Sequence, residues 1–157
     1  MATDDDKSGA SVKFPPPIVF LLFMLLAYGF HYLHPIEISS MPNLLTIGAF
    51  ITILGFVIIF IATHSFKRAQ TNIEPWKPTV RIISSGIFAY SRNPIYVAFC
   101  IITIGIGLIL NSFWVVSSFI PSIVVIFFSA IKREEVYLEN KFGQEYLSYK
   151  ENVRRWF

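Results

Sequence analysis

The sequence predicts an all-α integral membrane protein with four transmembrane helices, a cytosolic loop and a C-terminal amphipathic helix. Of its 157 residues, 54% are hydrophobic and only 15% are charged, an apolar excess beyond that of soluble domains. Four uncharged apolar stretches have about the 20-residue length that a helix needs to cross a bilayer. Every lysine and arginine falls in three segments that four crossings would place on the same side of the membrane. These observations exclude a soluble globular domain.

The first two predicted spans cover residues 16–33 and 44–63. The first is apolar apart from His31, and Pro15, Pro16 and Pro17 stand at its entrance, where a missing backbone N–H costs little. The second contains no charged residue. Both are therefore expected to be membrane-spanning helices.

The third and fourth predicted spans, residues 94–110 and 113–131, are separated only by Asn111 and Ser112. Such a short connector predicts an antiparallel helical hairpin. Pro121 lies in the middle of the fourth span and is expected to kink it, because proline cannot donate the backbone hydrogen bond of a helix interior.

The positions of the basic residues predict the orientation of the chain. All 13 lysines and arginines lie before the first span, between the second and third, or after the fourth. Positive loops stay in the cytoplasm, so a multi-pass topology with both termini and the central loop cytoplasmic follows. The net charge of +3 then reflects topology, and without an aromatic-interleaved basic patch it does not indicate nucleic-acid binding.

We expect one membrane domain, residues 15–157, after a disordered tail, residues 1–14. The tail is acidic and lacks the basic region of a secretory signal, so no cleavage is expected. The lone Cys100 is expected to be a buried small residue. No metal site is predicted at His31 and His34. The absence of charged residues from the spans disfavours a channel or transporter.

The first of two polar segments on the cytoplasmic side, residues 65–93, reads as loop and turns. It ends at Asn93 and Pro94, a favourable helix start. One interpretation is a capped span with Arg92 anchored at the membrane surface. The other is an anion site, because a helix N-terminus presents free N–H groups and partial positive charge.

The second polar segment, residues 132–157, has apolar residues at helical spacing, with Gly143 as a potential break: Leu138, Phe142, Tyr146, Tyr149, Val153 and Trp156. An amphipathic helix on the membrane surface would explain this pattern. However, the adjacent carboxylates Glu134 and Glu135 at the mouth of a span require a cation or hydrogen-bond donors. Because the predicted hairpin brings the two segments to one membrane face, a site between them is expected.

The residues of both segments resemble a known family. Arg92-Asn93-Pro94-Ile95-Tyr96 is similar to the Arg-(His or Asn)-Pro-x-Tyr motif of isoprenylcysteine carboxyl methyltransferases and their bacterial relatives. Glu134-Glu135-Val136-Tyr137-Leu138, the stretch from Phe142 to Tyr149 and the end at Val153 to Trp156 resemble the second block of the same family. The proline-rich entrance resembles bacterial members, which implies a bacterial inner membrane.

This resemblance implies S-adenosyl-L-methionine as the cofactor and a lipophilic or prenylated substrate taken from the bilayer. The residues that it places at the cofactor are Ile83, Ser84, Ser85, Phe88, Arg92, Asn93, Pro94, Tyr96, Glu134 and Tyr146. Arg133 and Glu135 are the candidate catalytic residues. The oligomeric state is left open.

The chain departs from the animal members of this family at two positions. Ala130 stands where they carry a substrate-contacting arginine, and Phe88 stands where they carry a tyrosine. A prenylated carboxyl group, a phospholipid amine and a small thiol therefore all remain open as methyl acceptors. A non-catalytic membrane scaffold that keeps the fold is the alternative function.

Overall fold

The structure is a computed structural model that describes residues 9, 10, 12 and 14–156. Within that part of the chain the secondary structure is entirely helical, without strands. The contacts divide the chain into two compact units, each made of discontinuous segments. The apolar unit comprises Pro16–Ile59 and Ile95–Ile126, and the polar unit comprises the described residues of 9–15, 60–94 and 127–156. The prediction of a single domain over residues 15–157 stays a prediction.

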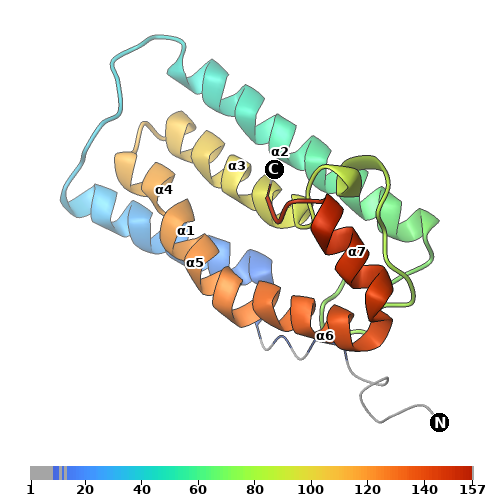
Figure 1. The fold of residues 1–157 in the computed structure, drawn as a ribbon. Coiled ribbons are helices and arrows are strands. Elements are labelled where there is room, and N and C mark those ends of the chain that lie inside the picture. The colour runs from blue at the N-terminus through green and yellow to red at the C-terminus, as the bar shows by residue number, and fades with distance from the viewer. Residues whose placement is uncertain (1–8, 11, 13, 157) are drawn as a thin grey trace. The chain divides into compact units, whose positions relative to one another are not determined.

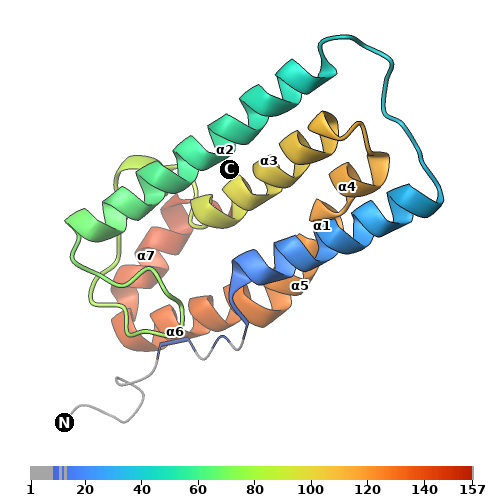
Figure 2. The same ribbon diagram turned by 180° about the vertical axis from the view of Figure 1, so that it is seen from behind.

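The apolar unit is a set of closely packed helices (Figures 1 and 2). Helix α1 (Pro16–Leu33) packs against α4 (Phe113–Ser117) and α5 (Phe119–Ile126). Helix α2 (Leu44–Arg68) passes beside α3 (Pro94–Ile109) at glycines, where a Cβ atom on Gly48 would lie 2.7 Å from the carbonyl oxygen of Gly105. Small residues that allow such backbone approach are typical of helix contacts in membranes.

Three helices among the described residues are long and apolar enough to cross a membrane: Pro16–Leu33, Leu44–Arg68 and Phe113–Phe142. The chain is thus an all-α membrane protein. Helix α3 is apolar but has only 16 residues, which at about 1.5 Å per residue falls short of the roughly 30 Å hydrocarbon core. The crossing predicted at residues 94–110 therefore stays a prediction.

The predicted hairpin turn at Asn111 and Ser112 is present. Asn111 has a left-handed φ of 48°, which asparagine tolerates better than most residues, and its Oδ1 atom accepts a hydrogen bond from the N–H of Ile38 at 3.0 Å. The Ser112 side chain caps α4 by accepting from the N–H of Val115. Turn and cap together explain why the three residues from Leu110 to Ser112 suffice to connect α3 and α4.

The structure has the predicted fourth span as an interrupted helix that runs on past residue 131. Regular α-helix is interrupted at Ser118, between α4 and α5, because Pro121 cannot donate to the carbonyl one turn before it. A single π-helical turn, η3 (Phe127–Ile131), follows, and the helix does not end at residue 131 but continues as α6 (Lys132–Phe142). Its apolar part nevertheless ends at Ile131, so the charged α6 lies beyond the apolar stretch.

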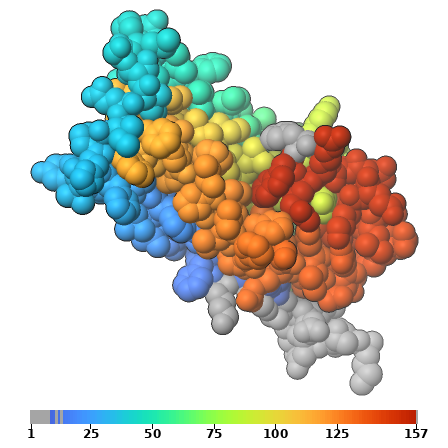
Figure 3. Space-filling model, turned by 60° about the vertical axis from the view of Figure 1, so that its left-hand side comes forward, coloured from blue at the N-terminus to red at the C-terminus, as the bar shows by residue number. Residues whose placement is uncertain are grey.

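The polar unit holds the end of α2, an irregular segment with the short 3-10 helix η2 (Gly86–Ala89), and the helices α6 and α7 (Gln144–Asn152). Gly143 separates α6 from α7 with a φ of 53°, which confirms the predicted interruption. In the space-filling view, α7 and the chain after it share one surface with part of the yellow-green segment around η2 (Figure 3).

The predicted disordered tail falls mostly outside the described residues. Of its described members, Ala10 and Val12 are buried. The backbone N–H groups of Gly9 and Ala10 donate to the carbonyls of Trp76 and Pro75. This part of the predicted tail thus packs on the irregular segment of the polar unit.

Candidate functional site

The centre of the polar unit is the carboxylate of Glu135, which lies between two arginines. Arg155 donates from Nε to Oε1 at 2.9 Å and from Nη2 to Oε2 at 3.0 Å. Arg92 donates from Nη1 to Oε1 at 3.1 Å. A two-point arginine–carboxylate contact fixes the orientation of both groups.

This cluster is shielded from solvent and carries excess positive charge. The side chains of Arg92 and Glu135 are only 8% and 11% exposed, and that of Arg155 is 33% exposed. Burial by itself raises the pKa of Glu135, but the Arg155 hydrogen bond and the charges of Arg155, Arg92 and Lys150 outweigh it and lower that pKa. Because two arginines face one carboxylate, one positive charge of the cluster is not neutralised.

Arg92 also reaches Tyr146 in α7, whose hydroxyl accepts from Nη1 at 3.5 Å. Burial raises the pKa of Tyr146, so its hydroxyl stays protonated at neutral pH. The Nε atom of Arg92 is buried and has no hydrogen-bond partner among the described residues. An unsatisfied guanidinium N–H is costly in such a place, and it reinforces the cationic character of the cluster.

The turn that carries Arg92 is held by the backbone after α7. The N–H of Arg92 donates to the carbonyl of Arg154 at 3.1 Å. The side-chain Nδ2 of Asn93 donates to the carbonyl of Arg155 at 3.1 Å, and the Ser91 hydroxyl reaches the same oxygen at 3.4 Å. Both Ser91 and Asn93 are buried. The backbone carbonyls of Arg154 and Arg155 therefore hold the first motif in place.

Helix η2 is tied to α7 in a similar way. The Tyr149 hydroxyl donates to the carbonyl of Phe88 at 2.7 Å, and burial raises the pKa of Tyr149, which keeps this donor protonated. The buried Phe88 ring makes an edge-to-face contact with Phe66, with ring centroids 5.4 Å apart. Helix α7 thus contacts both η2, through Tyr149, and Arg92, through Tyr146.

Comparison with known proteins assigns this arrangement to a family. The family model for phospholipid methyltransferases matches residues 44–145, more than half of the chain. The chain belongs to the phospholipid methyltransferase family. The matched range includes the Arg92-to-Tyr96 motif, the Glu134–Glu135 pair and the first residues of α7.

Individual relatives support the more specific resemblance to isoprenylcysteine carboxyl methyltransferases. A protein-S-isoprenylcysteine O-methyltransferase of Schizosaccharomyces pombe is 28% identical over 149 residues, 87% of this chain and 62% of the relative. One of Saccharomyces cerevisiae is 30% identical over 109 residues, 68% of this chain and 46% of the relative. An uncharacterized protein of Haemophilus influenzae is 69% identical over 26 residues, 17% of this chain and 41% of that protein. The chain spans less than two thirds of the length of these relatives.

The structure brings together four of the predicted site residues: Arg92, Asn93, Glu135 and Tyr146. Pro94 follows directly and is buried at the start of α3. Phe88 is buried in η2, whereas Ser84 and Ser85 are exposed and Ile83 is half-buried. Tyr96 is buried in the apolar unit.

The two candidate carboxylates differ in burial. Glu134, which the resemblance places at the cofactor, is half-buried, and Glu135 is the buried one. Arg133 is exposed in the first turn of α6. Ala130, at the position of the animal arginine, is fully buried in the π-helical turn.

The sequence assigned no role to Arg155 or to the hydroxyl of Tyr149. The structure places Arg155 in the hydrogen-bonded network around Arg92 and Glu135, and the hydroxyl of Tyr149 donates to the carbonyl of Phe88. A signal for Arg155 did exist. Two adjacent carboxylates beyond a span need a cation, and an arginine following an amphipathic helix can fold back to supply it. Groups of three histidine, cysteine or acidic residues able to hold a metal do not occur in the described ranges.

Proposed function

We propose that this protein transfers a methyl group from S-adenosylmethionine to a lipophilic acceptor that enters from the bilayer. One observation carries the proposal: the two motif blocks that resemble the methyltransferase site are joined in one hydrogen-bonded cluster, through Arg92, Glu135 and Arg155. Membership of a methyltransferase family supports it. When bound, S-adenosylmethionine supplies an electrophilic methyl group on a sulfonium sulfur.

The donor set of the cluster fits such a cofactor. One positive charge in excess, next to the first residue of α3, favours the cofactor carboxylate. The Asn93 amide and the carboxylate of Glu134 are suited to the amine and hydroxyl hydrogens of the cofactor. We assign cofactor binding to these residues together with Ile83, Ser84, Ser85, Phe88, Arg92, Pro94, Tyr96 and Tyr146.

Glu135 and Arg133 have different parts in this proposal. Both oxygens of Glu135 accept hydrogen bonds from arginines, so this carboxylate holds cations in place. Arg133, on the exposed side of the same helical turn, is the cation that orients an anionic acceptor. A carboxylate nucleophile needs no general base, so positioning and charge placement supply the rate enhancement.

The acceptor is a molecule with a lipid-like body, because the polar unit is continuous along the chain with helices long and apolar enough to cross a membrane. The two yeast relatives are named for a prenylated cysteine, and the family for phospholipids. A prenylcysteine carboxyl group and a phospholipid amine are therefore the two acceptors to compare, and a small thiol is the third.

The test is calorimetric titration of the purified protein in detergent with S-adenosylhomocysteine and S-adenosylmethionine. We expect the wild type to bind, and Asn93→Ala and Glu134→Ala to weaken binding about tenfold or more, since each removes a hydrogen bond to a polar ligand group. Asn140→Ala and Glu145→Ala are matched controls, because both residues are exposed on α6 and α7. They should bind like the wild type.

A folded wild type that binds neither compound would contradict the proposal and favour a membrane scaffold without chemistry. If binding is found, radiolabelled methyl transfer to vesicles containing phosphatidylethanolamine, to a farnesylcysteine and to a short alkyl thiol separates the three acceptor classes.

A further inference from the structure

The last described residues do not continue α7 but turn back along the first motif. Val153 adopts an extended conformation with φ −123° and ψ 127°, which ends the helix. The two carbonyls that follow then accept from the N–H of Arg92 and from the side chains of Ser91 and Asn93. This contact lies wholly within the polar unit.

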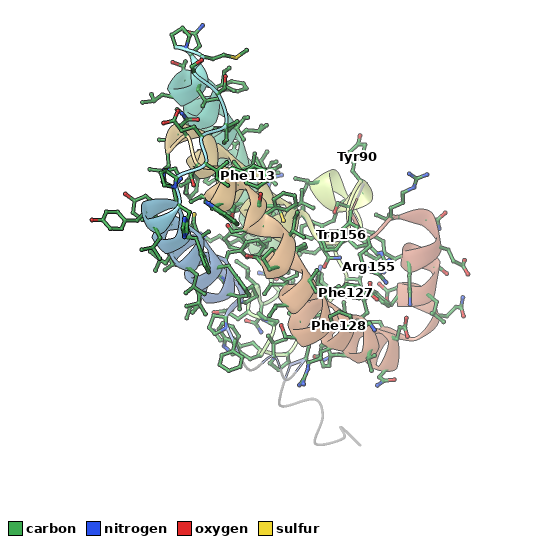
Figure 4. The ribbon with its side chains drawn as sticks, turned by 90° about the vertical axis from the view of Figure 1, so that its left-hand side faces the viewer. Tyr90, Phe113, Phe127, Phe128, Arg155 and Trp156 are labelled. Carbon is green, nitrogen blue, oxygen red and sulfur yellow. The ribbon has the colours of Figure 1, made fainter. Side chains whose placement is uncertain are left out.

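Arg155 is the residue of this segment that touches both motif blocks. Its carbonyl oxygen holds Asn93 of the first block, and its guanidinium holds Glu135 of the second. The guanidinium also lies over the ring of Phe127, with Cζ 5.1 Å from the ring centroid (Figure 4). A cation placed over an aromatic face and a two-point carboxylate contact leave the side chain few alternative orientations.

The carbonyl of Arg155 determines which end of the Asn93 amide is offered to a ligand. A carbonyl oxygen only accepts hydrogen bonds, so it holds the Nδ2 end of the amide. The Oδ1 end, which is itself an acceptor, must then point the other way. Asn93 is thereby prepared to accept a hydrogen bond from a ligand N–H or O–H group.

Glu135 transmits the second contact to α6. Glu134 precedes it in the first turn of this helix, so fixing the Glu135 carboxylate restrains the backbone that carries Glu134. In the absence of Arg155, Glu135 would retain Arg92 alone, through one hydrogen bond. The two blocks would then be linked by this single hydrogen bond, and the separation between Asn93 and Glu134 would be fixed less tightly.

From this geometry we infer that Arg155 is a positioning residue of the methyl-donor site, which holds Asn93 and the Glu134–Glu135 turn at a fixed separation. The inference rests on the proposed function and adds to it a residue that acts through Asn93 and Glu135. It acts through preorganisation: with only the Arg92–Glu135 hydrogen bond between the blocks, the cofactor must order them further as it binds.

The experiment compares Arg155→Gln and Arg155→Lys with Arg154→Gln. Arg154 is the matched control, because it is an adjacent arginine with an exposed side chain whose contribution to the cluster is its backbone carbonyl. Calorimetry with S-adenosylhomocysteine measures the dissociation constant, and methyl transfer at saturating acceptor gives KM and kcat for the methyl donor. Circular dichroism and gel filtration in detergent check that each variant is folded.

We expect Arg155→Gln to raise the dissociation constant and the donor KM about tenfold or more, with a much smaller change in kcat, because Arg155 acts on the position of the donor-binding residues. Arg155→Lys should recover part of this loss, since an ammonium group keeps the charge but not the two-point contact. Arg154→Gln should match the wild type.

Three outcomes overturn the inference. If the wild type binds and both folded Arg155 variants bind equally well, Arg155 does not position the donor site, although the proposed function stands. If Arg154→Gln weakens binding as much as Arg155→Gln, the effect is one of general charge. If the wild type itself does not bind, the proposed function fails, and the inference fails with it. Should Arg155→Gln not fold, the comparison of Arg155→Lys with Arg154→Gln decides.

Discussion

At the residue scale, Glu135 shows how a buried carboxylate is tolerated beyond the apolar part of a membrane helix. Isolated burial of such a charge would be costly, but three hydrogen bonds from Arg92 and Arg155 satisfy its two oxygens. The neighbouring pair of Glu139 and Lys150, about one third exposed, contrasts with it. Ion pairs at that exposure contribute about 0–1 kcal/mol, whereas removing one partner of a buried pair costs about 3–5 kcal/mol.

We therefore predict that Glu135→Gln lowers the free energy of unfolding at pH 7 by about 3 kcal/mol, and Glu139→Gln by less than about 1 kcal/mol. The pKa of Glu135 is lower in the folded protein than its ordinary value of 4.5, so its stabilising effect is present above that value and is lost as the pH falls through the folded pKa. Thermal unfolding in detergent between pH 7 and pH 3 measures this effect. The gap between wild type and Glu135→Gln should narrow below about pH 4.5, and a gap that stays constant to pH 3 would contradict the assignment.

At the element scale, Gly143 sets the angle at which α7 leaves α6. Its φ of 53° and ψ of −124° lie in a region that residues with a Cβ atom rarely adopt. A Cβ atom built there meets no other atom within 4 Å, so the requirement for glycine comes from the backbone conformation and not from packing. The turn matters for the site, because it brings Tyr146 and Tyr149 back towards the first motif.

Gly143→Ala should destabilise the protein by about 1–3 kcal/mol, the usual cost of a disfavoured backbone conformation, and weaken cofactor binding along with it. Gly29→Ala is the control, because Gly29 lies within α1 and a Cβ atom there also meets nothing within 4 Å. That substitution should be neutral or slightly stabilising. Chemical denaturation in mixed micelles measures both variants. Equal free energies of unfolding for Gly143→Ala and Gly29→Ala would contradict the requirement for glycine at this turn.

Element boundaries could be predicted where local chemistry determines them. The prolines before α1, the Asn111–Ser112 turn and Gly143 each mark a boundary that the structure has. The end of the fourth span at residue 131 stays a prediction, because the helix itself continues as α6, where lysine, arginine and glutamate are good helix formers. Periodicity also could not indicate the π-helical turn at Phe127–Ile131.

At the scale of the whole molecule, the site could be predicted only in part. The resemblance to the methyltransferase family associates Arg92, Asn93, Glu135 and Tyr146, and the fold brings these four residues together. The contribution of the last residues could not be predicted, because their contacts to Ser91, Arg92 and Asn93 use backbone carbonyls, which every residue has. Long-range pairs between single side chains, such as Arg155 with Glu135, leave no periodic signal.

Topology is the whole-molecule property that the sequence predicts and that an experiment can test directly. The basic residues predict that both termini and the segment around η2 lie in the cytoplasm and that the loop at residues 34–43 lies outside. In that arrangement α3 crosses the bilayer although it has only 16 residues. Local thinning of the membrane, or the added length of Arg92 and Asn93 before the helix start, would compensate for its shortness. If α3 did not cross, the segment around η2 and α7 would lie on opposite sides and could not share the Tyr149–Phe88 hydrogen bond.

We therefore predict that Ser40→Cys and Ser148→Cys, each in a Cys100→Ala background, label from opposite sides of the membrane. Both serines are exposed, Ser40 in the predicted outer loop and Ser148 on α7, and Cys100 is the single native cysteine. In spheroplasts of an expressing bacterium, a membrane-impermeant maleimide should label Ser40→Cys at once and Ser148→Cys only after permeabilisation. Labelling of Ser148→Cys in intact spheroplasts would place the α7 end of the site outside, away from any cytoplasmic supply of S-adenosylmethionine, and the proposed reaction would then lack its methyl donor.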